Sequence, residues 1–339
     1  MYSEEFILNE VNSIREEIGH DKVNIFIEDI YFDEKTNELW IITEDRPDKS
    51  AIIGKGGWVV GKLREKLCLE SIHVESYGDF LNKNYKLKLS KKTIGNVNLD
   101  STGLNNLEKI IDKKLENIYS FSFENYFEKN DFEESANNEA VVALSGGVDS
   151  SFSLILAKKL GFNPVAVTVD PGTIILPNQF KKNIKLLIKT LDIKHEYLKT
   201  DYSQIIAESL EGNVHPCGRC SKSTGEKVKQ YAKDNEIPII IFGDMLATGS
   251  QCINLQEDSL YRLNLPASLC VGKQDIKSLI KNYDLKTFKG FGCPLLYEVH
   301  KKFPHMKKFS IQRILRETRS GALEPGESLD LIWSFYKLK

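Results

Sequence analysis

The chain has 339 residues, of which 41% are hydrophobic and 28% are charged, so it can bury a substantial core and is long enough for two domains. The formal net charge of −2 provides no global basic excess, and any nucleic-acid contact must come from local clusters of lysine and arginine. No segment is long and apolar enough to cross a membrane, the first residues lack a secretory pattern, and six cysteines do not form a disulfide framework in a chain of this length. We therefore expect a soluble, cytoplasmic protein whose clustered cysteines serve metal or redox chemistry.

Residues 1–96 are predicted to form a first unit that mixes helices and strands. Apolar residues recur at helical spacing between Phe6 and Ile18. Three runs have the β-branched and aromatic content of strands, and they cover residues 23–32, 38–43 and 71–76. A glycine turn then separates a short helical stretch from a helix expected at 58–67. The expected order is helix, strand, strand, short helix, glycine turn, helix, strand.

The glycine turn reads Gly54-Lys55-Gly56-Gly57. Glycines let a backbone approach phosphate closely, and Lys55 adds positive charge. In this element order the turn resembles the GxxG loop of a type II KH domain, which clamps the backbone of four single-stranded nucleotides. The resemblance implies that residues 1–96 form a small α+β KH-like domain that binds RNA through these four residues. The alternative is a helix–helix turn in a structural domain.

The stretch that follows this unit changes in composition. Residues 82–92 alternate lysine with apolar or aromatic residues, and we expect an edge strand whose lysines either meet phosphate or are simply solvated. Residues 105–121 have an amphipathic helical pattern, and residues 131–138 are polar and acidic. We interpret residues 97–137 as a helical connector between two domains.

Apolar strands alternate with helices in residues 138–310, which predicts an α/β domain with a doubly wound parallel sheet. The strands are expected at 140–144, 164–169, 195–198 and 238–242, and the helices at 152–160, 180–191 and 223–234. Ligands bind such sheets at the carboxyl ends of the strands. The residues after the first, second and fourth of these strands should therefore converge on one crevice.

The first of these strands ends in Ser145-Gly146-Gly147-Val148-Asp149-Ser150. Glycines permit positive φ, and the N–H groups at the start of the following helix attract phosphate, to which the hydroxyls of Ser145 and Ser150 add donors. The spacing and the lysine of a Walker A loop are missing. Ser-Gly-Gly-x-Asp-Ser instead resembles the pyrophosphate loop, or PP-loop, of the N-type ATP pyrophosphatases. Those enzymes split ATP into AMP and pyrophosphate while they activate a carbonyl oxygen.

This resemblance implies a site for ATP and Mg²⁺ at the carboxyl ends of the strands. The residues expected to bind ATP are Ser145, Gly146, Gly147, Asp149, Ser150, Val169, Asp170 and Gly243. Asp170 has a second interpretation, because an aspartate before Pro171 is also typical of an ordinary turn.

A second cluster reads His215-Pro216-Cys217-Gly218-Arg219-Cys220, and we expect it on a loop that reaches the crevice. A C-x-x-C pair brings two thiols together, either as metal ligands or as a redox pair. A further cysteine, Cys293, follows a glycine-rich turn far downstream. Together with the pyrophosphate loop, this arrangement resembles the tRNA sulfur-transfer enzymes of the TtcA/TtuA type. In those enzymes a C-x-x-C pair and one distant cysteine hold a [4Fe-4S] cluster with one iron site open.

The resemblance implies Cys217, Cys220 and Cys293 as the cluster ligands, in line with thiolate ligation of iron–sulfur clusters in general. Cys270 is a weaker rival to Cys293 as the third ligand, and two alternatives to the cluster itself stay open. Zinc accepts three or four such ligands, with His215 as a possible fourth. Cys217 and Cys220 could also act as a persulfide and its resolving thiol without metal, as in ThiI-like sulfurtransferases.

The sequence departs from that family after the strand 238–242. The family commonly has Gly-His-x-x-Asp-Asp there, whereas this chain has Gly243-Asp244 and lacks the paired carboxylate. Asp244 is expected to bind Mg²⁺ or to polarise the substrate. With Asp149, Cys217 and Cys220 it completes the set of expected catalytic residues.

Basic residues gather near the carboxyl terminus. Residues 299–309 interleave lysines with aromatics, and residues 311–339 are expected to form a helical segment whose arginines recur every three positions on one face. A basic face beside the crevice suits an RNA backbone, although a solvated helix face is the alternative. The residues expected to contact RNA here are Lys301, Lys302, Lys307, Lys308, Arg316 and Arg319.

These features predict an ATP-dependent RNA sulfurtransferase, with tRNA as its substrate, that adenylates a nucleobase carbonyl and replaces the oxygen with sulfur. Its expected cofactors are ATP, Mg²⁺ and a [4Fe-4S] cluster, its sulfur donor is sulfide or a persulfide carrier, and a homodimer is compatible with the sequence. Two rivals belong to other classes. One is an amide-forming ligase of the same fold, and the other is a non-catalytic RNA-binding protein whose nucleotide site is a switch.

Overall fold

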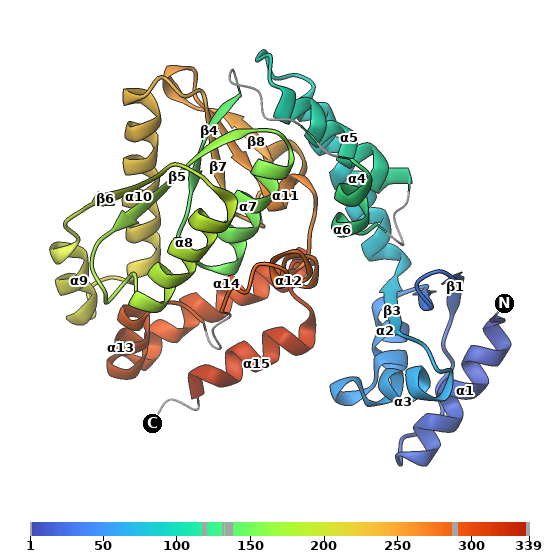
Figure 1. Ribbon diagram of the computed structural model, residues 1–339. Helices are drawn as coiled ribbons and strands as arrows, with labels where there is room; N and C mark the ends of the chain where they lie inside the picture. The colour runs from blue at the N-terminus through green and yellow to red at the C-terminus, as the bar shows by residue number, and fades with distance from the viewer. Residues whose placement is uncertain (1, 117–120, 131, 133–137, 287–290, 337–339) are drawn as a thin grey trace. The chain divides into compact units, whose positions relative to one another are not determined.

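The computed structural model describes residues 2–116, 121–130, 132, 138–286 and 291–336 (Figure 1). Their contacts divide the chain into two compact units. Unit 1 runs to Tyr85, and unit 2 comprises residues 86–116 and the chain from Phe121 onward. No helix in the described parts of the chain has the length and apolar character needed to span a membrane.

Unit 1 is a three-stranded sheet covered on one face by helices. Its elements are α1 (Glu4–Glu17), β1 (Ile27–Asp33), β2 (Glu38–Thr43), α2 (Arg46–Ile53), η1 (Lys55–Gly57), α3 (Trp58–Lys66) and β3 (Ser71–Ser76). The order is the one expected from the sequence. β2 lies in the middle, antiparallel to β1 and parallel to β3. Alternate residues of β2, Leu39 and Ile41, pack with the buried faces of the helices to form the core of this unit.

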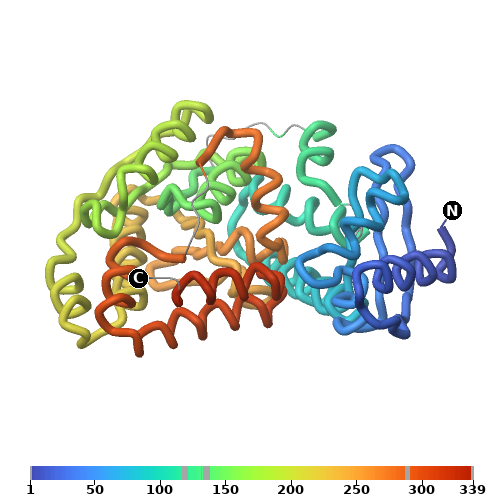
Figure 2. Tube along the Cα trace, turned by 90° about the horizontal axis from the view of Figure 1, so that it is seen from below, coloured from blue at the N-terminus to red at the C-terminus, as the bar shows by residue number. Residues whose placement is uncertain are grey.

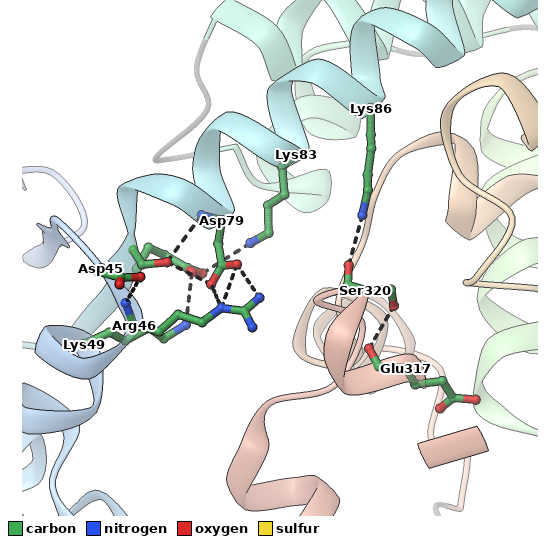
Figure 3. Close-up of polar contacts among 10 residues, drawn as sticks. Asp45, Arg46, Lys49, Asp79, Lys83, Lys86, Glu317 and Ser320 are labelled. Atoms are coloured by element: carbon green, nitrogen blue, oxygen red, sulfur yellow. Dashed lines mark hydrogen bonds and ion pairs between the residues drawn. The ribbon is translucent and has the colours of Figure 1, made fainter. Parts of the chain in front are cut away.

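Charged side chains fix α2, the helix that leads into the glycine turn (Figure 3). Lys49 is only 7% exposed, and its Nζ lies 3.1 Å from a carboxylate oxygen of Glu75. Lys83 approaches the same carboxylate at 3.4 Å, and Arg46 donates to both carboxylate oxygens of Asp79. Burial raises the pKa of Glu75, but Lys83 and Lys49 outweigh it and the pKa is lowered overall. The carboxylate therefore stays ionised and holds α2 against β3.

The expectation of a strand at residues 82–92 is wrong, because these residues lie within the helix α4 (Tyr77–Ile94). Its buried residues Leu87, Ser90 and Ile94 are spaced three and four apart, which is a helical period rather than a strand period. In the sequence, the alternation of lysine with leucine and tyrosine is too short to distinguish the period of a helix from that of a strand. Within unit 2, Lys86 donates to the carbonyl of Ser320 at 3.2 Å (Figure 3).

The helix expected at 105–121 is α5 (Thr102–Glu116), and the part of that expectation at 117–120 lies outside the described residues. A second helix, α6 (Phe123–Lys129), follows it. Of the expected acidic stretch 131–138, only residues 132 and 138 are described.

Unit 2 contains a six-stranded sheet in the order β6-β5-β4-β7-β9-β8. The strands are β4 (Glu139–Ala143), β5 (Asn163–Asp170), β6 (His195–Lys199), β7 (Ile239–Phe242), β8 (Ile253–Leu255) and β9 (Tyr261–Asn264). All pairs are parallel except β8 with β9. The predicted α/β fold is thereby confirmed, while the two short strands β8 and β9 were not anticipated.

Helices cover both faces of this sheet (Figure 1). The helices from residue 148 onward are α7 (Val148–Lys159), α8 (Asn178–Leu191), α9 (Ser203–Leu210), α10 (Pro216–Asp234), α11 (Leu265–Ser268), α12 (Lys273–Lys281), α13 (Pro294–Lys302), α14 (Lys307–Arg319) and α15 (Pro325–Tyr336), of which the last three lie beyond the edge of the sheet. Short 3₁₀ turns occur at Gly249–Gln251, Glu257–Ser259 and Pro304–Met306. Val142 points into the core shared with α7 and α8, whereas its neighbour Val141 packs with α10 on the other face. The helices α14 and α15 lie side by side (Figure 2).

We expect Gly146→Ala to lower the free energy of unfolding by about 2 kcal/mol or more, because a left-handed conformation alone costs a non-glycine residue about 1–2 kcal/mol. Gly146 has φ +75°, and a Cβ there would lie 2.5 Å from the carbonyl oxygen of Phe180. Gly147→Ala is the matched control, since a Cβ there meets nothing closer than the Ser145 hydroxyl at 3.5 Å. Urea denaturation of both variants tests this, and equal stability would contradict the account.

Candidate functional site

The turn between β4 and α7 is held by its own hydroxyls and by neighbouring backbone. Ser145 donates its N–H to the hydroxyl of Ser150 at 3.1 Å, and the two hydroxyls lie 3.0 Å apart. Gly147 is the residue before α7 and has no side chain to cap the helix. The N–H groups at the start of α7 are therefore available to an anion.

The end of β7 presses against this turn. A Cβ at Gly243 would lie 2.9 Å from the backbone of both Asp149 and Ser150, so only glycine fits there. Asn183 of α8 donates to the carbonyl of Gly146 at 3.3 Å. The structure thus brings the turn 145–150 and the end of β7 together, as the parallel sheet predicts.

A pocket of about 410 Å³ opens beside the turn. Its apolar wall is formed by the side chains of Val167, Val169, Ile175, Leu176 and Phe180. Its polar and thiol groups come from Ser145, Asp149, Ser150, Cys220, Cys293, Asp244, Arg262 and Arg313. We call this space the thiol pocket. An apolar wall with a few convergent polar groups is the usual character of a small-molecule site.

A larger pocket of about 910 Å³ lies on the other side of the same turn. It is lined by the whole turn from Ser145 to Ser150 and by the side chains of Lys273, Lys277, Lys286 and Arg313, with Glu317, Glu327 and Asp330. We call it the lysine pocket. The turn is therefore a shared wall, with thiols on one side and lysines on the other.

Each of the three carboxylates predicted at the strand ends is paired with a cation that the sequence analysis did not identify. Lys273 donates to both carboxylate oxygens of Asp149, at 2.5 and 2.6 Å. The other two pairs, each at 2.5 Å, are Lys181 with Asp170 and Arg262 with Asp244. The cations belong to α12, α8 and β9, and none stands in a recognisable motif.

The pair with Lys181 keeps Asp170 charged at the end of β5. Burial raises the pKa of Asp170, but Lys181 and the N–H of Gly172 outweigh it and hold the pKa below its usual value. Arg262 also stacks over the ring of Phe242, with its guanidinium carbon 4.2 Å from the ring centre. The guanidinium that faces Asp244 is thus fixed on two sides.

The C-x-x-C pair does not lie on a loop, as the sequence analysis expected. Cys217 and Cys220 occupy the first turn of α10, which begins at Pro216. Proline is favoured at the first position of a helix, and this signal in the sequence was overlooked. Cys293 is the residue immediately before α13, so all three thiols sit at the amino ends of helices.

The three thiols lie within electrostatic reach of one another. Burial, reinforced by Cys293, raises the pKa of both Cys217 and Cys220 to about 11. Burial also raises the pKa of Cys293. Among the residues that the structure describes, no three His, Cys, Asp or Glu side chains are gathered closely enough to hold a metal ion.

Arg313 lies at the site, although its side chain is half exposed like a surface residue. It lines both pockets, and its Nε donates to the carboxylate of Glu317 at 3.0 Å. Its charge opposes the rise in the pKa of Cys217. The next two arginines of α14, Arg316 and Arg319, are exposed.

Of the other residues expected to contact RNA, some are hydrogen-bonded within the protein and others are exposed to solvent. Lys302 donates to the carbonyl of Leu210 at 2.8 Å, at the end of α9, and Lys307 donates to the carbonyl of Phe335 at 2.7 Å, in α15. Both lysines therefore join helices to one another. Lys301 and Lys308 are exposed. In unit 1, Gly54, Gly56 and Gly57 all have positive φ, and Lys55 between them is exposed.

A buried hydroxyl connects the helices that carry the cysteines. Ser310 of α14 lies 3.3 Å from Nε2 of His215, which precedes α10, and 3.1 Å from Nε2 of His300 on α13. His300 is 1% exposed. Burial, together with the charges of His215 and Lys307, lowers the pKa of His300 from 6.5 to about 4.

No family model matches the chain. The uncharacterized protein MJ1638 of Methanocaldococcus jannaschii is 38% identical over 191 residues, which are 56% of this chain and 71% of that protein. An NH(3)-dependent NAD(+) synthetase of Staphylothermus marinus is 37% identical over 76 residues, which are 22% of this chain and 28% of the synthetase. The chain therefore spans well under half of the synthetase's length.

Two solved structures are distantly similar. The U34-tRNA thiolase NcsA from Methanococcus maripaludis, with its [4Fe-4S] cluster, is 14% identical with a TM-score of 0.36, over 61% of this chain and 72% of that one. The NMN synthetase from Francisella tularensis is 16% identical with a TM-score of 0.37, over 71% and 97% of the two chains. At these TM-scores neither structure bears on the activity of this chain.

We predict that acidification weakens the fold through His300. Its pKa is lower in the folded chain than in the unfolded one, so the unfolded state binds the extra proton and stability falls as the pH drops below about 6.5. Between pH 7 and pH 5 this one group should remove about 2 kcal/mol. Over the same pH interval the stability of His300→Gln should fall by about 2 kcal/mol less than that of the wild type. A substitution at the exposed His305 should leave the loss of stability as large as in the wild type. Urea denaturation at both pH values measures the difference, and identical losses in wild type and His300→Gln would rule it out.

Proposed function

The chain belongs to the same family as the uncharacterized protein MJ1638, and we propose its function from its own site. We propose that it is an ATP-dependent RNA sulfurtransferase with tRNA as its substrate. One observation carries the proposal. The thiols of Cys220 and Cys293 line the same pocket as Ser145, Asp149 and Ser150 of the glycine turn. In this proposal the turn binds phosphate and the thiols hold the cluster that presents sulfur, and a reaction that couples the two requires them to share one space.

The sequence Ser145–Ser150 has the residues and the strand–turn–helix setting of a pyrophosphate loop. In the proposed reaction the N–H groups and hydroxyls of this turn bind the phosphates of ATP, and Asp149 holds Mg²⁺. Val169 and Asp170, at the end of β5, lie beside the adenosine, while Gly243 lets β7 approach the turn. The apolar wall of the thiol pocket suits the adenine ring.

The proposed chemistry has two displacements. The carbonyl oxygen of an unstacked nucleobase attacks the α-phosphorus of ATP, an oxygen–phosphorus bond forms, and the bond to pyrophosphate breaks. Sulfide, whose attack needs no further reductant, then forms a carbon–sulfur bond to the adenylated carbon and loses its proton. The carbon–oxygen bond breaks and AMP leaves with the former carbonyl oxygen. Adenylation is needed because oxide is a poor leaving group and AMP is a good one.

The donor chemistry at the cysteines fits an iron–sulfur cluster, since three partly buried thiols lie within electrostatic reach of one another. Cys217, Cys220 and Cys293 would hold the cluster, which requires them to draw closer than they lie in the structure. When bound, such a cluster supplies an iron with a free position for sulfur. With a pKa of about 11, the unligated thiols of Cys217 and Cys220 are poor nucleophiles at neutral pH, which weighs against a cluster-free persulfide pair.

RNA binding is assigned to two places. The element order of unit 1 and the turn Gly54–Gly57 support a KH-like domain that clamps single-stranded RNA. In unit 2, Lys301, Lys308, Arg316 and Arg319 are exposed and can meet phosphate. Lys302 and Lys307 contribute less, because each already binds a backbone carbonyl.

An ATP-dependent amide-forming ligase is the second candidate, and the local match to an NH(3)-dependent synthetase favours it. A ligase of this kind uses the same turn and the same adenylation, with ammonia or an amine as the nucleophile. It has no use for the thiols. The cysteines therefore distinguish the two functions.

Protein purified without oxygen should contain about four iron and four acid-labile sulfide per chain, as a [4Fe-4S] cluster requires. Cys217→Ala, Cys220→Ala and Cys293→Ala should each lose the cluster and the ability to thiolate unmodified tRNA. Cys68→Ala is the matched control, because this thiol is exposed in unit 1, and it should keep both. Iron analysis and mass spectrometry of the digested tRNA measure the two outcomes.

Three results are informative here. If iron-free protein thiolates tRNA and the activity depends on Cys217 and Cys220, these two cysteines act as a persulfide pair and the cluster hypothesis is wrong. Full thiolation in all three cysteine variants would overturn the role of the thiols. Formation of AMP with ammonia and a carboxylate, without any thionucleoside, would establish the ligase instead.

Lys273 is expected to turn from Asp149 to the phosphates of ATP when Mg²⁺ occupies that carboxylate. Hydrogen bonds to charged groups are worth about 1.5–3 kcal/mol, so Lys273→Met should weaken ATP binding roughly 10- to 150-fold. Lys281→Met is the matched control at the far, exposed end of α12. Equilibrium dialysis with ATP and Mg²⁺ measures the affinity, and unchanged binding in Lys273→Met would exclude this role.

A further inference from the structure

Trp58 is exposed to an unusual degree for its size. It is the first residue of α3, directly after the glycine turn, and 66% of it is accessible to solvent. No other large apolar side chain in the described parts of the chain is more exposed. By contrast, Trp40 in the same unit is 7% exposed. A broad ring left in solvent beside a candidate binding turn needs an explanation other than packing.

The turn beside Trp58 presents bare backbone. A Cβ at Gly54 would overlap Val59 at 2.3 Å, so this glycine belongs to the packing of the unit. Gly56 faces only the indole, whose Cδ1 would lie 3.5 Å from a Cβ built there, and Gly57 faces open space. Gly61, one helical turn after Trp58, also has nothing within 4 Å of a Cβ. The indole is therefore flanked by glycines on both sides and not covered by neighbouring side chains.

The surroundings favour a nucleotide over an apolar partner. Lys55 is exposed within the turn, where its charge can meet a phosphate. Two apolar residues of α3, Val59 and Leu63, belong to the core of unit 1 and are fully buried. Trp58 is thus the one large apolar side chain that α3 exposes, and a single flat ring suits one base better than the side chains of a peptide.

We propose that the indole of Trp58 is a stacking platform for one unpaired base of single-stranded RNA whose backbone lies along the turn Gly54–Gly57. This rests on the proposed function, and it adds the residue that binds a base where the turn and Lys55 bind only backbone. Stacking tolerates any base, because every base has an aromatic face. Trp58 therefore raises affinity for unpaired RNA without selecting a sequence.

Two probes separate base contacts from backbone contacts in the full chain. One is a fluorescein-labelled oligoadenylate of about ten nucleotides, and the other is an abasic ribose-phosphate chain of equal length. Loss of one stacked base costs about 1–3 kcal/mol, so Trp58→Ala should weaken oligoadenylate binding roughly 5- to 150-fold. It should leave abasic binding within about twofold and leave the salt dependence unchanged, since stacking releases no counterions.

Three comparison variants complete the design. Trp58→Phe keeps an aromatic face and should retain most of the affinity. Trp333→Ala removes a similarly exposed indole, 59% accessible, from unit 2 and should change neither affinity. Lys55→Ala should weaken both probes and reduce the slope of log K against log salt by about one.

The outcomes distinguish this proposal from the function on which it rests. If Trp58→Ala binds oligoadenylate as wild type does while Lys55→Ala weakens both probes, stacking is overturned and RNA binding stands. If Trp58→Ala weakens both probes equally, the indole acts through the backbone of the turn and stacking is again overturned. If the wild-type chain binds neither probe nor a tRNA transcript, the RNA-binding part of the proposed function fails with it.

Discussion

The arrangement of unit 2 depends on backbone packed directly against backbone around one turn. Gly146 leaves no room for a side chain beside α8, and Gly243 leaves none between β7 and the start of α7. These two close approaches hold the turn after β4, near the centre of the sheet, with its N–H groups directed to the carboxyl edge. The turn lines both pockets, so the thiols of one pocket and the lysines of the other lie around it.

Electrostatic balance is the second constraint at this edge. Asp149, Asp170 and Asp244 would repel a nucleotide if they stood alone, yet each is paired with a lysine or an arginine. In the proposed function, a bound phosphate takes the place of the carboxylate beside each cation, and a bound cation takes the place of the ammonium or guanidinium beside each carboxylate. The same cations receive the phosphates in the proposed function.

Features that are contiguous in the sequence were the most predictable, with two exceptions. The turn 145–150 was recognisable because the strand, the glycines and the helix start are contiguous in the sequence. The partners Lys181, Arg262 and Lys273 could not be recognised, since each comes from a different element and only the fold brings them to the carboxylates. The lysine-rich stretch 82–92 was misread because alternation over so few residues fits a strand and a helix alike. For the C-x-x-C pair a local signal did exist, as Pro216 marks the start of a helix.

The central claim is that the turn and the thiols act on one substrate, a nucleobase carbonyl activated by ATP. The most direct measurement uses tRNA whose target carbonyls carry ¹⁸O, incubated with the wild-type chain, ATP, Mg²⁺ and sulfide. The account predicts that the AMP released carries one ¹⁸O in its phosphate for each thionucleoside formed. AMP that takes its new oxygen from water, or thionucleosides formed without labelled AMP, would contradict it.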